Sequence, residues 1–443
     1  MQLSIIWSQN TESMVQEMRK MKDSGIEWIK SIPENWTCKR GKQLFIETNE
    51  RSTTGKEELL TVSHITGITP RHQKNVNMFM SESLIGYKIC HVGDIAANTM
   101  WMWQGAIGVS NYHGVISPSY NTYRQRTNTY DSKYLDYLLR IQPLIDTYAT
   151  YSTGITISRL RLYPESFLSI YFTVPPLAEQ QNISNYLNIH CSEIDLMLSK
   201  TRSSIEEYKK LKQAVITQAV TKGVRGERKI KDSGIEWIGK IPREWGQPKI
   251  KMVASFFNGD RTSRYPQPAD FVDDGVAFLT SRNIDGDEVN LSEAKYITEN
   301  KYNSLSGAKI QINDIIFCLR GSVGKCAINQ ILSCGTVASS LATIRPNGVC
   351  PKYLLYFLLS NIASTQTAIF MNGTCAANLS AENVANYYIT LPSSTEQKEI
   401  ADYLDAKCTE IDKLIAKKEQ LVKELESYKK SLIYEVITGK REV

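Results

Sequence analysis

Short segments of this sequence combine basic or amide side chains with glycine and other turn-forming residues. Arginine and lysine contact phosphate oxygens, and arginine, asparagine and glutamine are well suited to base edges. In the second half of the chain these segments cover residues 258–271, 280–285 and 318–325. The candidate nucleic-acid contacts there are Arg261, Arg264, Tyr265, Arg282, Asn283, Arg320, Ser322 and Lys325.

The first half of the chain has less sharply defined counterparts in residues 63–74, 98–105 and 150–161. The candidates are His64, Arg71, Lys74, Asn98, Trp103, Gln104, Ser152, Thr153, Arg159 and Arg161. For each residue taken singly, a plain solvated surface position is the alternative, so the prediction rests on the loops as groups. Trp101 and Trp103 could equally belong to a core, as large aromatic side chains often do.

No catalytic motif accompanies these segments. The nearest match to an adenine methyltransferase N-P-P-Y loop is VPPL at 174–177, which lacks the polar residue that would hold the target amino group. TTGKEE at 53–58 is not the G-x4-G-K-[ST] loop of a phosphate-binding motif. The nine cysteines and five histidines show no zinc-binding or disulfide spacing. We therefore expect neither a metal nor a catalytic residue in this chain.

The composition is that of ordinary globular material, with 42% hydrophobic and 22% charged residues among 443. A chain of this length normally forms more than one domain. The net charge of +6 is compatible with a polyanionic partner but does not establish one. No apolar run approaches the ~18 residues of a membrane span, and no secretory signal is evident, so a cytoplasmic location is expected.

An internal repeat organises the chain. KDSGIEWIKSIPENW at 22–36 recurs as KDSGIEWIGKIPREW at 231–245, with eleven of fifteen positions identical and an offset of 209. Residues 180–222 then align without gaps on 397–439 at an offset of 217. The chain is thus two copies of one unit, which consists of a short motif, a globular segment and a long helix.

The two globular segments share only short landmarks. HVGDIAA (91–97) matches QINDIIF (311–317), WQGAIGV (103–109) matches LRGSVGK (319–325), GVISPSYNTYR (114–124) matches GTVASSLATIR (335–345), and FTVPP (172–176) matches ITLPS (389–393). Such short alternating or apolar runs are typical of half-buried strands. We predict one α+β fold, present twice with different surface residues. Similar helices then indicate one partner met twice, and divergent globular parts indicate two different ligands.

The repeated helical segments contain neither glycine nor proline over 179–221 and 396–438, and each follows a proline and ends at a glycine. Heptad spacing predicts a coiled-coil seam. The predicted seam residues are Ile194, Met197, Thr201, Ser204, Tyr208, Leu211 and Val215, and Ile411, Leu414, Lys418, Leu421, Leu425, Tyr428 and Leu432. Forty-three residues give ~65 Å of helix. An antiparallel pair of this length could space two half-sites ~34 Å apart, although a plain packing face is the simpler interpretation.

These motifs, twice and in order, resemble the specificity subunits of type I restriction-modification enzymes. The resemblance rests on KDSGIEWI before each globular segment and on VPPLAEQQNISNYLNIHCSEID (174–195) and LPSSTEQKEIADYLDAKCTEID (391–412) after it. The first of these lacks one residue before its Glu-Gln. The helix exits AVITQAVTKG (214–223) and SLIYEVITGK (431–440) are similar to the family as well.

The resemblance implies two mixed α/β target recognition domains on an antiparallel two-helix coiled coil. The expected boundaries are an N-terminal extension at 1–21 without an assigned role, recognition domains at 22–175 and 224–391, and spacer helices at 176–223 and 392–443. The domains would each bind half of a bipartite, double-stranded DNA target. Two modification subunits would methylate adenine with S-adenosylmethionine, and restriction subunits using ATP and Mg²⁺ could join. These cofactors would belong to the partners, and no membrane is involved.

Two alternatives stay open at this point. A free-standing DNA-modifying enzyme would need catalytic motifs that the sequence does not display. A structural coiled-coil scaffold without a nucleic-acid role would leave the basic loops of two divergent globular domains unexplained.

Overall fold

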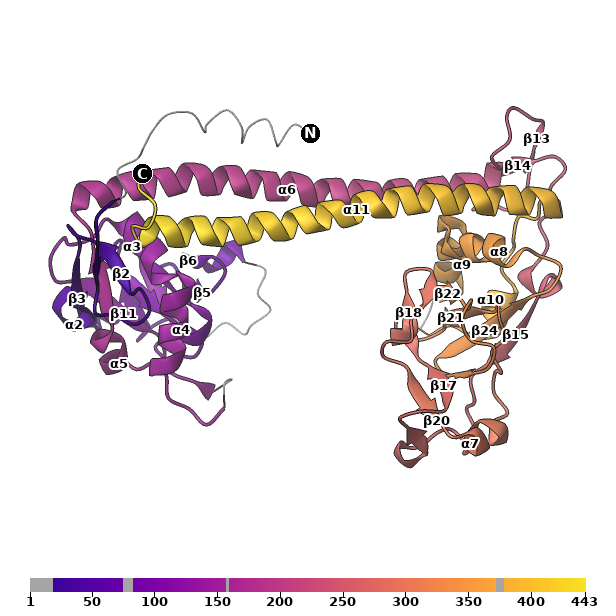
Figure 1. Ribbon diagram of the computed structural model, residues 1–443, viewed down its shortest axis with the longest axis horizontal. Coiled ribbons are helices and arrows are strands. Elements are labelled where there is room, and N and C mark those ends of the chain that lie inside the picture. The colour runs from indigo at the N-terminus through magenta and orange to yellow at the C-terminus, as the bar shows by residue number, and fades with distance from the viewer. Residues whose placement is uncertain (1–18, 75–82, 157–158, 372–377) are drawn as a thin grey trace. The chain divides into compact units, whose positions relative to one another are not determined.

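The computed structural model describes residues 19–74, 83–156, 159–371 and 378–443. The chain divides into two compact units (Figure 1). Unit 1 comprises residues 1–200 and 421–443, and unit 2 comprises residues 201–420. Both boundaries fall inside long helices, so each unit contains a part of α6 (Leu177–Lys222) and a part of α11 (Ser394–Ile437). No helix of the described residues is long and apolar enough to span a membrane.

Unit 1 is built on a four-stranded antiparallel sheet with the strand order β4-β11-β8-β9, accompanied by the pairs β1-β2, β3-β12, β5-β6 and β7-β10. Its strands are β1 (Met21–Asp23), β2 (Ser31–Pro33), β3 (Thr37–Arg40), β4 (Phe45–Thr48), β5 (Leu60–Ser63), β6 (Gly67–Pro70), β7 (Lys88–Cys90), β8 (Ile95–Ala97), β9 (Ile107–Val109), β10 (Gly114–Ile116), β11 (Asn121–Gln125) and β12 (Tyr171–Val174). Its shorter helices are α2 (Gly41–Leu44), η1 (Arg71–Gln73), η2 (Met102–Gln104), α3 (Ser132–Leu139), α4 (Gln142–Tyr151) and α5 (Pro164–Ser169).

Unit 2 has a six-stranded sheet, β15-β24-β21-β22-β19-β18, a four-stranded sheet, β16-β20-β17-β23, and the hairpin β13-β14. Its strands are β13 (Ile230–Asp232), β14 (Lys240–Pro242), β15 (Ala254–Asn258), β16 (Phe271–Val272), β17 (Val276–Leu279), β18 (Ile284–Asp285), β19 (Glu288–Val289), β20 (Lys295–Ile297), β21 (Ile315–Cys318), β22 (Cys326–Ile328), β23 (Thr336–Val337) and β24 (Leu341–Pro346). Its shorter helices are η4 (Ile250–Met252), η5 (Pro268–Asp270), η6 (Ser281–Asn283), α7 (Glu299–Ser304), α8 (Pro351–Leu359), α9 (Asn361–Phe370) and α10 (Ala381–Ala385). The α+β fold predicted from the sequence is confirmed.

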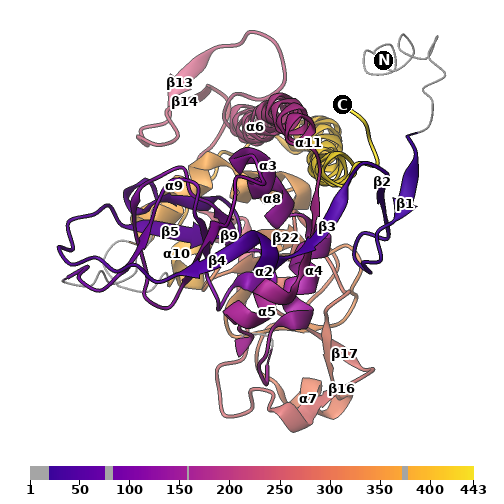
Figure 2. The same ribbon diagram turned by 90° about the vertical axis from the view of Figure 1, so that its left-hand side faces the viewer.

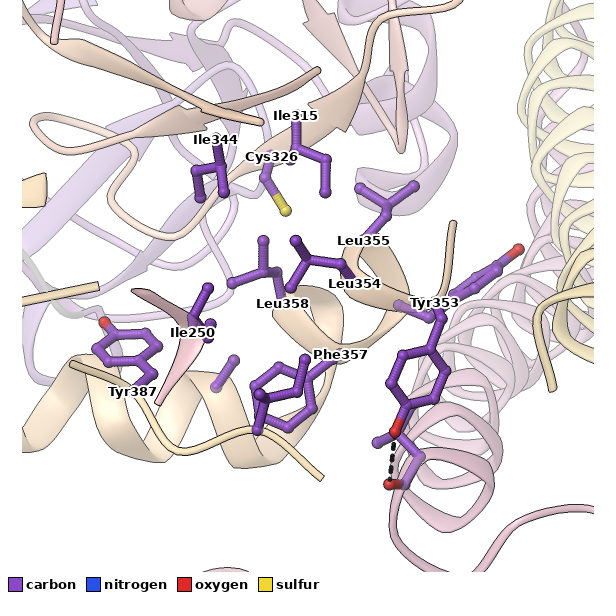
Figure 3. Packing of buried hydrophobic residues seen from close by; sticks show 14 of the residues in the cluster. Ile250, Ile315, Cys326, Ile344, Tyr353, Leu354, Leu355, Phe357, Leu358 and Tyr387 are labelled. Atoms are coloured by element: carbon purple, nitrogen blue, oxygen red, sulfur yellow. Dashed lines mark hydrogen bonds between the residues drawn. The ribbon is translucent and has the colours of Figure 1, made fainter. Parts of the chain in front are cut away.

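One short helix carries the core of each unit. In unit 2, α8 starts at Pro351, whose fixed φ suits the first helical turn, and six of its nine residues are buried. Leu354 and Leu358 of α8 face Ile315 and Ile344 from the six-stranded sheet (Figure 3). Burial of such side chains contributes roughly 1.5–3 kcal/mol each. A helix that is apolar on every side can be stable only where it is enclosed, here between the sheet and the long helices.

One short helix in each unit, α3 in unit 1 and α8 in unit 2, attaches the globular part to the long helices. In unit 1, Tyr134 of α3 donates a hydrogen bond to the Ile437 carbonyl at the end of α11, 3.1 Å away. Figure 2 shows α3 lying directly against the helix pair. In unit 2, Tyr353 of α8 donates to the Thr390 carbonyl at 2.8 Å and lies 3.4 Å from the Val220 carbonyl at the end of α6. These paired tyrosines confirm that one fold is present twice.

The long helices run antiparallel in both units. In unit 1, Lys429 pairs with Asp195 at 2.7 Å, and Arg441 lies over the Tyr186 ring at 6.0 Å. Residue numbers along α11 therefore rise as those along α6 fall. In unit 2 the corresponding contact joins Lys212 to Asp412 at 2.6 Å. The predicted antiparallel coiled coil is confirmed, and the two ion pairs occupy equivalent positions of the repeat.

The predicted heptad frame is wrong at alternate seam positions. Met197, Leu211 and Tyr428 are 53%, 48% and 44% exposed. The seam instead contains Leu198 and Ile205, which are 6% and 7% exposed. The frame shifts by one residue because branched aliphatic side chains at 198 and 205 bury more effectively than their flexible or amphipathic neighbours. Lys212 and Lys429 occupy the next equivalent positions, where they keep their charges by pairing with aspartates across the seam.

The repeated motif forms a hairpin followed by a buried tryptophan that rests on a helix start. In unit 2, Arg228 lies over the Trp245 ring at 5.3 Å and pairs with Glu396, which also accepts a 3.0 Å hydrogen bond from the indole Nε1. In unit 1 Arg19 likewise lies over the Trp36 ring at 5.5 Å and pairs with Glu179, whereas the Trp36 indole Nε1 makes no hydrogen bond within the described residues.

The last residues of the N-terminal extension predicted at 1–21 take part in contacts of the repeated module. Arg19 contacts Trp36 and Glu179, and Met21 is the first residue of β1, so the repeated module includes both. The signal was present in the sequence, since Arg19-Lys20 is repeated as Arg228-Lys229. Residues 1–18 of the predicted extension lie outside the described residues.

Candidate nucleic-acid interface

A turn at residues 338–340 is the centre of one edge of unit 2. Strands β15 and β21 both pair antiparallel with β24, so their C-terminal ends lie beside the start of β24, which directly follows this turn. Strands β17 and β23 pair in parallel and end at the same place. Hydrogen bonds join the Ala338 amide to the Leu279 carbonyl at 2.8 Å and the Leu319 amide to the Ser340 carbonyl at 2.9 Å. Three predicted segments, 258–271, 280–285 and 318–325, thereby meet at one edge.

Glycine allows the first of these segments to approach the turn. A Cβ added to Gly259 would lie 2.3 Å from the Ala338 carbonyl oxygen, so a larger residue could not occupy this position. Arg261 then crosses the turn and donates from Nε to the Ser339 carbonyl at 3.3 Å. Arg264 is exposed on the same loop. Tyr265, in contrast, is half-buried and packs edge-on against Phe278, with ring centroids 5.8 Å apart.

A buried carboxylate shapes this loop. Asp260 is 4% exposed and accepts hydrogen bonds from the amide and hydroxyl of Thr262 at 2.7 and 2.6 Å. It also accepts two from Ser306, at 2.8 and 3.1 Å. Burial alone would raise the pKa of Asp260, but these four hydrogen bonds outweigh it and hold the pKa well below its usual range. The loop that presents Arg261 and Arg264 is thus pinned by an ionised aspartate.

The segment after β17 forms the short helix η6. Its Thr280 hydroxyl accepts from the Arg282 amide, and Arg282 is exposed. Asn283 is 1% exposed, and its amide nitrogen donates to the Asn290 carbonyl at 3.1 Å. The structure therefore places Arg282 on the surface and Asn283 inside as a support of the turn.

The β21-β22 hairpin loop supplies the third group. Arg320 donates from Nε to Asn378 at 3.0 Å, and Ser322 and Lys325 are exposed. Gly321 and Gly324 have φ of 75° and 87°, and open space surrounds the position of an added Cβ at each. The edge thus combines exposed cations with backbone that a phosphate could approach closely. The structure brings together Arg261, Arg264, Arg282, Arg320, Ser322 and Lys325.

Unit 1 has the same edge in its smaller sheet. The hydroxyl of Thr99, which follows β8, donates to the Ser119 carbonyl at 3.0 Å, as the Leu319 amide donates to the Ser340 carbonyl in unit 2. The Leu162 amide donates to the Thr99 carbonyl at 3.3 Å, as the Leu379 amide donates to the Leu319 carbonyl at 3.0 Å. The loop after β8, the turn before β11 and the segment after α4 therefore correspond to the β21-β22 loop, the turn at 338–340 and the segment that contains Leu379 in unit 2.

One landmark alignment from the sequence is out of register at this edge. Strand β9 pairs with β8 as β22 pairs with β21, so residues 105–109 correspond to 324–328 rather than to 321–325. The connecting loop has nine residues in unit 1 (98–106) and seven in unit 2 (319–325). A gapless comparison cannot recognise such a difference in loop length.

The unit 1 edge carries aromatic rings where unit 2 carries arginines. His64 and Trp103 both lie nearly parallel to Trp101, with interplanar angles of 14° and 16° and ring centroids 6.4 and 6.1 Å away. Trp101 is 46% exposed. Gln104 follows in η2 and is half-buried. Sequence reasoning underrated Trp101, because a tryptophan in an apolar context is usually assigned to a core.

An arginine is fixed beside these rings. Arg140 donates to the carbonyl oxygens of His64 and Ile65 at 3.1 and 2.8 Å. Burial and the nearby Arg140 lower the pKa of Lys74. Burial raises the pKa of Tyr120, whose hydroxyl accepts a hydrogen bond from Asn98, and Arg71 lies in η1, directly after β6. Arg140 was not predicted, since it lies within a helical stretch rather than a loop.

Asn98 stands at the base of this group. It is 6% exposed, donates to the Tyr120 hydroxyl at 3.0 Å and accepts from the Met100 amide at 3.3 Å. The structure therefore brings His64, Trp103 and Gln104 together on a turn that the buried Asn98 positions, and it places Arg71 in η1 and Lys74 directly after η1.

The remaining candidates lie on the segment after α4, which projects from the unit as a long loop (Figure 1). Thr153 and Arg161 exchange backbone hydrogen bonds of 3.0 and 2.9 Å at its base. Thr153, Arg159 and Arg161 are exposed, whereas the Ser152 hydroxyl donates to the Tyr148 carbonyl at 2.6 Å. The hydrogen bond from Leu162 to Thr99 ties this loop to the aromatic group.

In both units an ion pair with a buried aspartate stands at the other end of the strands that lead to the edge. Arg124 binds both oxygens of Asp94 at 2.7 and 2.9 Å, and Arg345 binds both oxygens of Asp314 at 2.9 and 2.8 Å. The aspartate side chains are 2% and 1% exposed. Hydrogen bonding to these carboxylates raises the pKa of both arginines. Such planar, two-point pairs fix orientation, so the edges share a rigid frame and differ in the side chains that they present.

Known proteins share this organisation. The family model described as "Type I restriction modification DNA specificity domain" matches residues 242–426. The type I restriction enzyme MjaVIII specificity subunit of Methanocaldococcus jannaschii is 25% identical over 334 residues, which cover 74% of each chain. The putative MjaX specificity subunit of the same organism is 24% identical and covers 93% of this chain and 95% of its own.

A solved structure shares the fold. It was described for complex assembly and conformational transition of the type I restriction-modification system, and it matches with a TM-score of 0.72 at 14% identity. The match covers 93% of this chain and 99% of that one. The duplicated edge, the antiparallel helix pair and these relatives agree with the family that the repeated motifs indicated. Residues 242–426 match the type I restriction-modification DNA specificity domain, and most of the chain is similar to the specificity subunits of type I restriction-modification enzymes.

Proposed function

We propose that this chain selects the DNA target of a type I restriction-modification complex by binding one half of a bipartite sequence at each edge. The observation that carries the proposal is the duplicated edge itself, in which one braced frame presents rings in unit 1 and arginines in unit 2. A protein that met one ligand twice would have little reason for this divergence. Arginine and lysine side chains at both edges suit the phosphates and base edges of double-stranded DNA.

The repeated modules, in contrast, would meet identical partners. Two modification subunits docked there would methylate adenine with S-adenosylmethionine, and restriction subunits using ATP and Mg²⁺ would join the same complex. In this proposal the chain itself contributes recognition and no catalysis, and the lengths of α6 and α11 determine the unread gap between the half-sites.

Comparison of adenine methylation across the genome of the source cell, with and without this chain, tests the proposal. Loss of one asymmetric, bipartite motif with a fixed gap is expected, and it would define both half-sites. An unchanged pattern in cells that express the chain and its partners would contradict the proposal. The purified chain incubated alone with DNA and S-adenosylmethionine should transfer no methyl groups, and transfer would favour a free-standing enzyme.

A further inference from the structure

The aromatic group of unit 1 is held in place rather than loosely exposed. The Trp101 amide donates to the Asn98 carbonyl at 2.9 Å, and the Trp103 indole donates to the Met100 carbonyl at 3.1 Å. Asn98 is itself buried and hydrogen-bonded on both sides of its amide group. The backbone that carries Trp101 therefore has little freedom, although nearly half of the side chain is open to solvent.

The turn after Trp101 is anchored to α4. Met102 is 1% exposed, and Gly105 ends η2 with a φ of 82°. A Cβ added to Gly105 would lie 2.6 Å from the Ile145 side chain, so only glycine permits this approach. Burial of Met102 on one side of the turn leaves Trp101 on the outer side. An apolar ring fixed at a polar edge, and not used in the core, is a candidate for ligand contact.

The surroundings favour an anionic ligand with flat faces. Arg140 is held against the carbonyls of His64 and Ile65, so a cation is fixed beside the rings. A nucleotide combines an aromatic base with a phosphate, and side chains of this kind both stack on bases and unstack duplex steps. In unit 2 the corresponding loop has Gly321 and Val323 near Arg320, so stacking would be confined to unit 1.

We propose that the Trp101 indole stacks on one nucleobase of the half-site bound by unit 1, with Trp103 and His64 supporting the ring. This inference rests on the proposed DNA-recognition function and assigns to unit 1 a mode of contact that unit 2 does not use. Base stacking contributes roughly 1–3 kcal/mol per base, which corresponds to about a 5- to 150-fold change in affinity. The contact tolerates other rings, so Trp101→Phe should retain part of the affinity.

This inference is tested by measuring how tightly the chain, assembled with its modification subunits, binds a DNA duplex. The duplex carries the bipartite sequence that the methylation comparison defines. Trp101→Ala should weaken binding about 5- to 150-fold, and Trp101→Phe should weaken it less. Val92→Ala is the matched control, because Val92 is 67% exposed and lies at the opposite end of β8. An abasic nucleotide is then placed at each half-site position in turn. At one position the effects of the abasic nucleotide and of Trp101→Ala should not add, because each removes the same contact.

The outcomes separate the two proposals. Additive effects at every position, or a Trp101→Ala variant that binds as tightly as the Val92→Ala control, would overturn the stacking contact while leaving DNA recognition intact. Impaired assembly of Trp101→Ala with its modification subunits, at unchanged DNA affinity, would assign Trp101 to a protein interface and overturn it as well. A wild-type complex that binds the target duplex no better than a scrambled one would instead contradict the proposed function.

Discussion

Unit 1 and unit 2 use the same frame for different surface chemistry. In both units a partly exposed arginine pairs with a buried aspartate at one end of the strands, and at the other end a turn accepts a hydrogen bond from the neighbouring loop. Unit 1 places Trp101 and Trp103 on that frame, whereas unit 2 places Arg261 and Arg320 there. The comparison teaches that the parts that orient the loops are alike in the two units, whereas the side chains proposed to contact DNA differ.

The largest expected effect tests whether the two frames are equivalent. Asp314→Ala would leave Arg345 without its buried partner and should lower the free energy of unfolding by about 3–5 kcal/mol. Asp94→Ala should destabilise unit 1 by a similar amount, although Glu50 provides Arg124 with a second partner at 3.0 Å. Urea unfolding of both variants measures these losses. If Asp314→Ala left the stability unchanged while Asp94→Ala lowered it, the ion pairs of the two units would not be equivalent.

The next effect separates arginine contacts from ring contacts. Replacing Arg261 and Arg320 with glutamine should weaken DNA binding by about 1–3 kcal/mol wherever the arginine binds a base edge. For every phosphate that an arginine neutralises, its replacement should reduce the slope of log affinity against log salt by about 0.9. Trp101→Ala should leave the slope unchanged, since an indole neutralises no phosphate. Titrations at several salt concentrations distinguish these outcomes, and equal slopes in wild type and the arginine double variant would contradict the contrast between the edges.

A smaller effect concerns the pinned loop of unit 2. Because the pKa of Asp260 is lowered in the folded protein, its stabilisation is complete above the unfolded value of ~3.9 and is lost as pH falls through the folded value. Asp260→Asn should cost about 1–3 kcal/mol at pH 7, and the difference should shrink as pH falls below ~4. Thermal melts at pH 7 and pH 3 measure this, and a cost that stays constant with pH would rule out the ionised form.

The smallest expected effect lies in the seam of the helix pair. Lys212→Ala and Lys429→Ala each remove a partly exposed ion pair, and such pairs contribute about 0.2–1 kcal/mol. The two variants should lose nearly equal stability, because the pairs are equivalent under the repeat. Denaturant titrations compare them, and a loss confined to one variant would indicate that the two ends of the seam differ.

The sequence predicted the repeat-bearing elements well, since the repeated motif and the long helices recur with their spacing intact. It did not predict correctly which of two adjacent residues packs into an interface, because both have a suitable side chain. Met197 and Leu198 are both apolar, and only packing decides which one enters the seam. Arg19 was assigned to an extension, although it completes an interaction with Trp36 and Glu179.

The edge was predicted as a set of loops but not residue by residue. Asn98 and Asn283 look like surface amides in the sequence, yet each is buried because its side chain satisfies the backbone of a turn. Arg140 was missed because its contribution arises from tertiary contact with the carbonyls of His64 and Ile65. Hydrogen-bond partners far apart in sequence cannot be inferred from local composition.

The division of the chain into two units affects the order in which they can fold during translation. Unit 2 is one continuous stretch, but unit 1 needs residues 421–443, whose contacts include the hydrogen bond from Tyr134 to the Ile437 carbonyl and the close approach of Gly439 to Trp36. At ~5–20 residues per second, the ribosome needs roughly 10–50 s to extend the chain from residue 200 to its end. The part of the protein that is translated first is therefore the last that can complete its core.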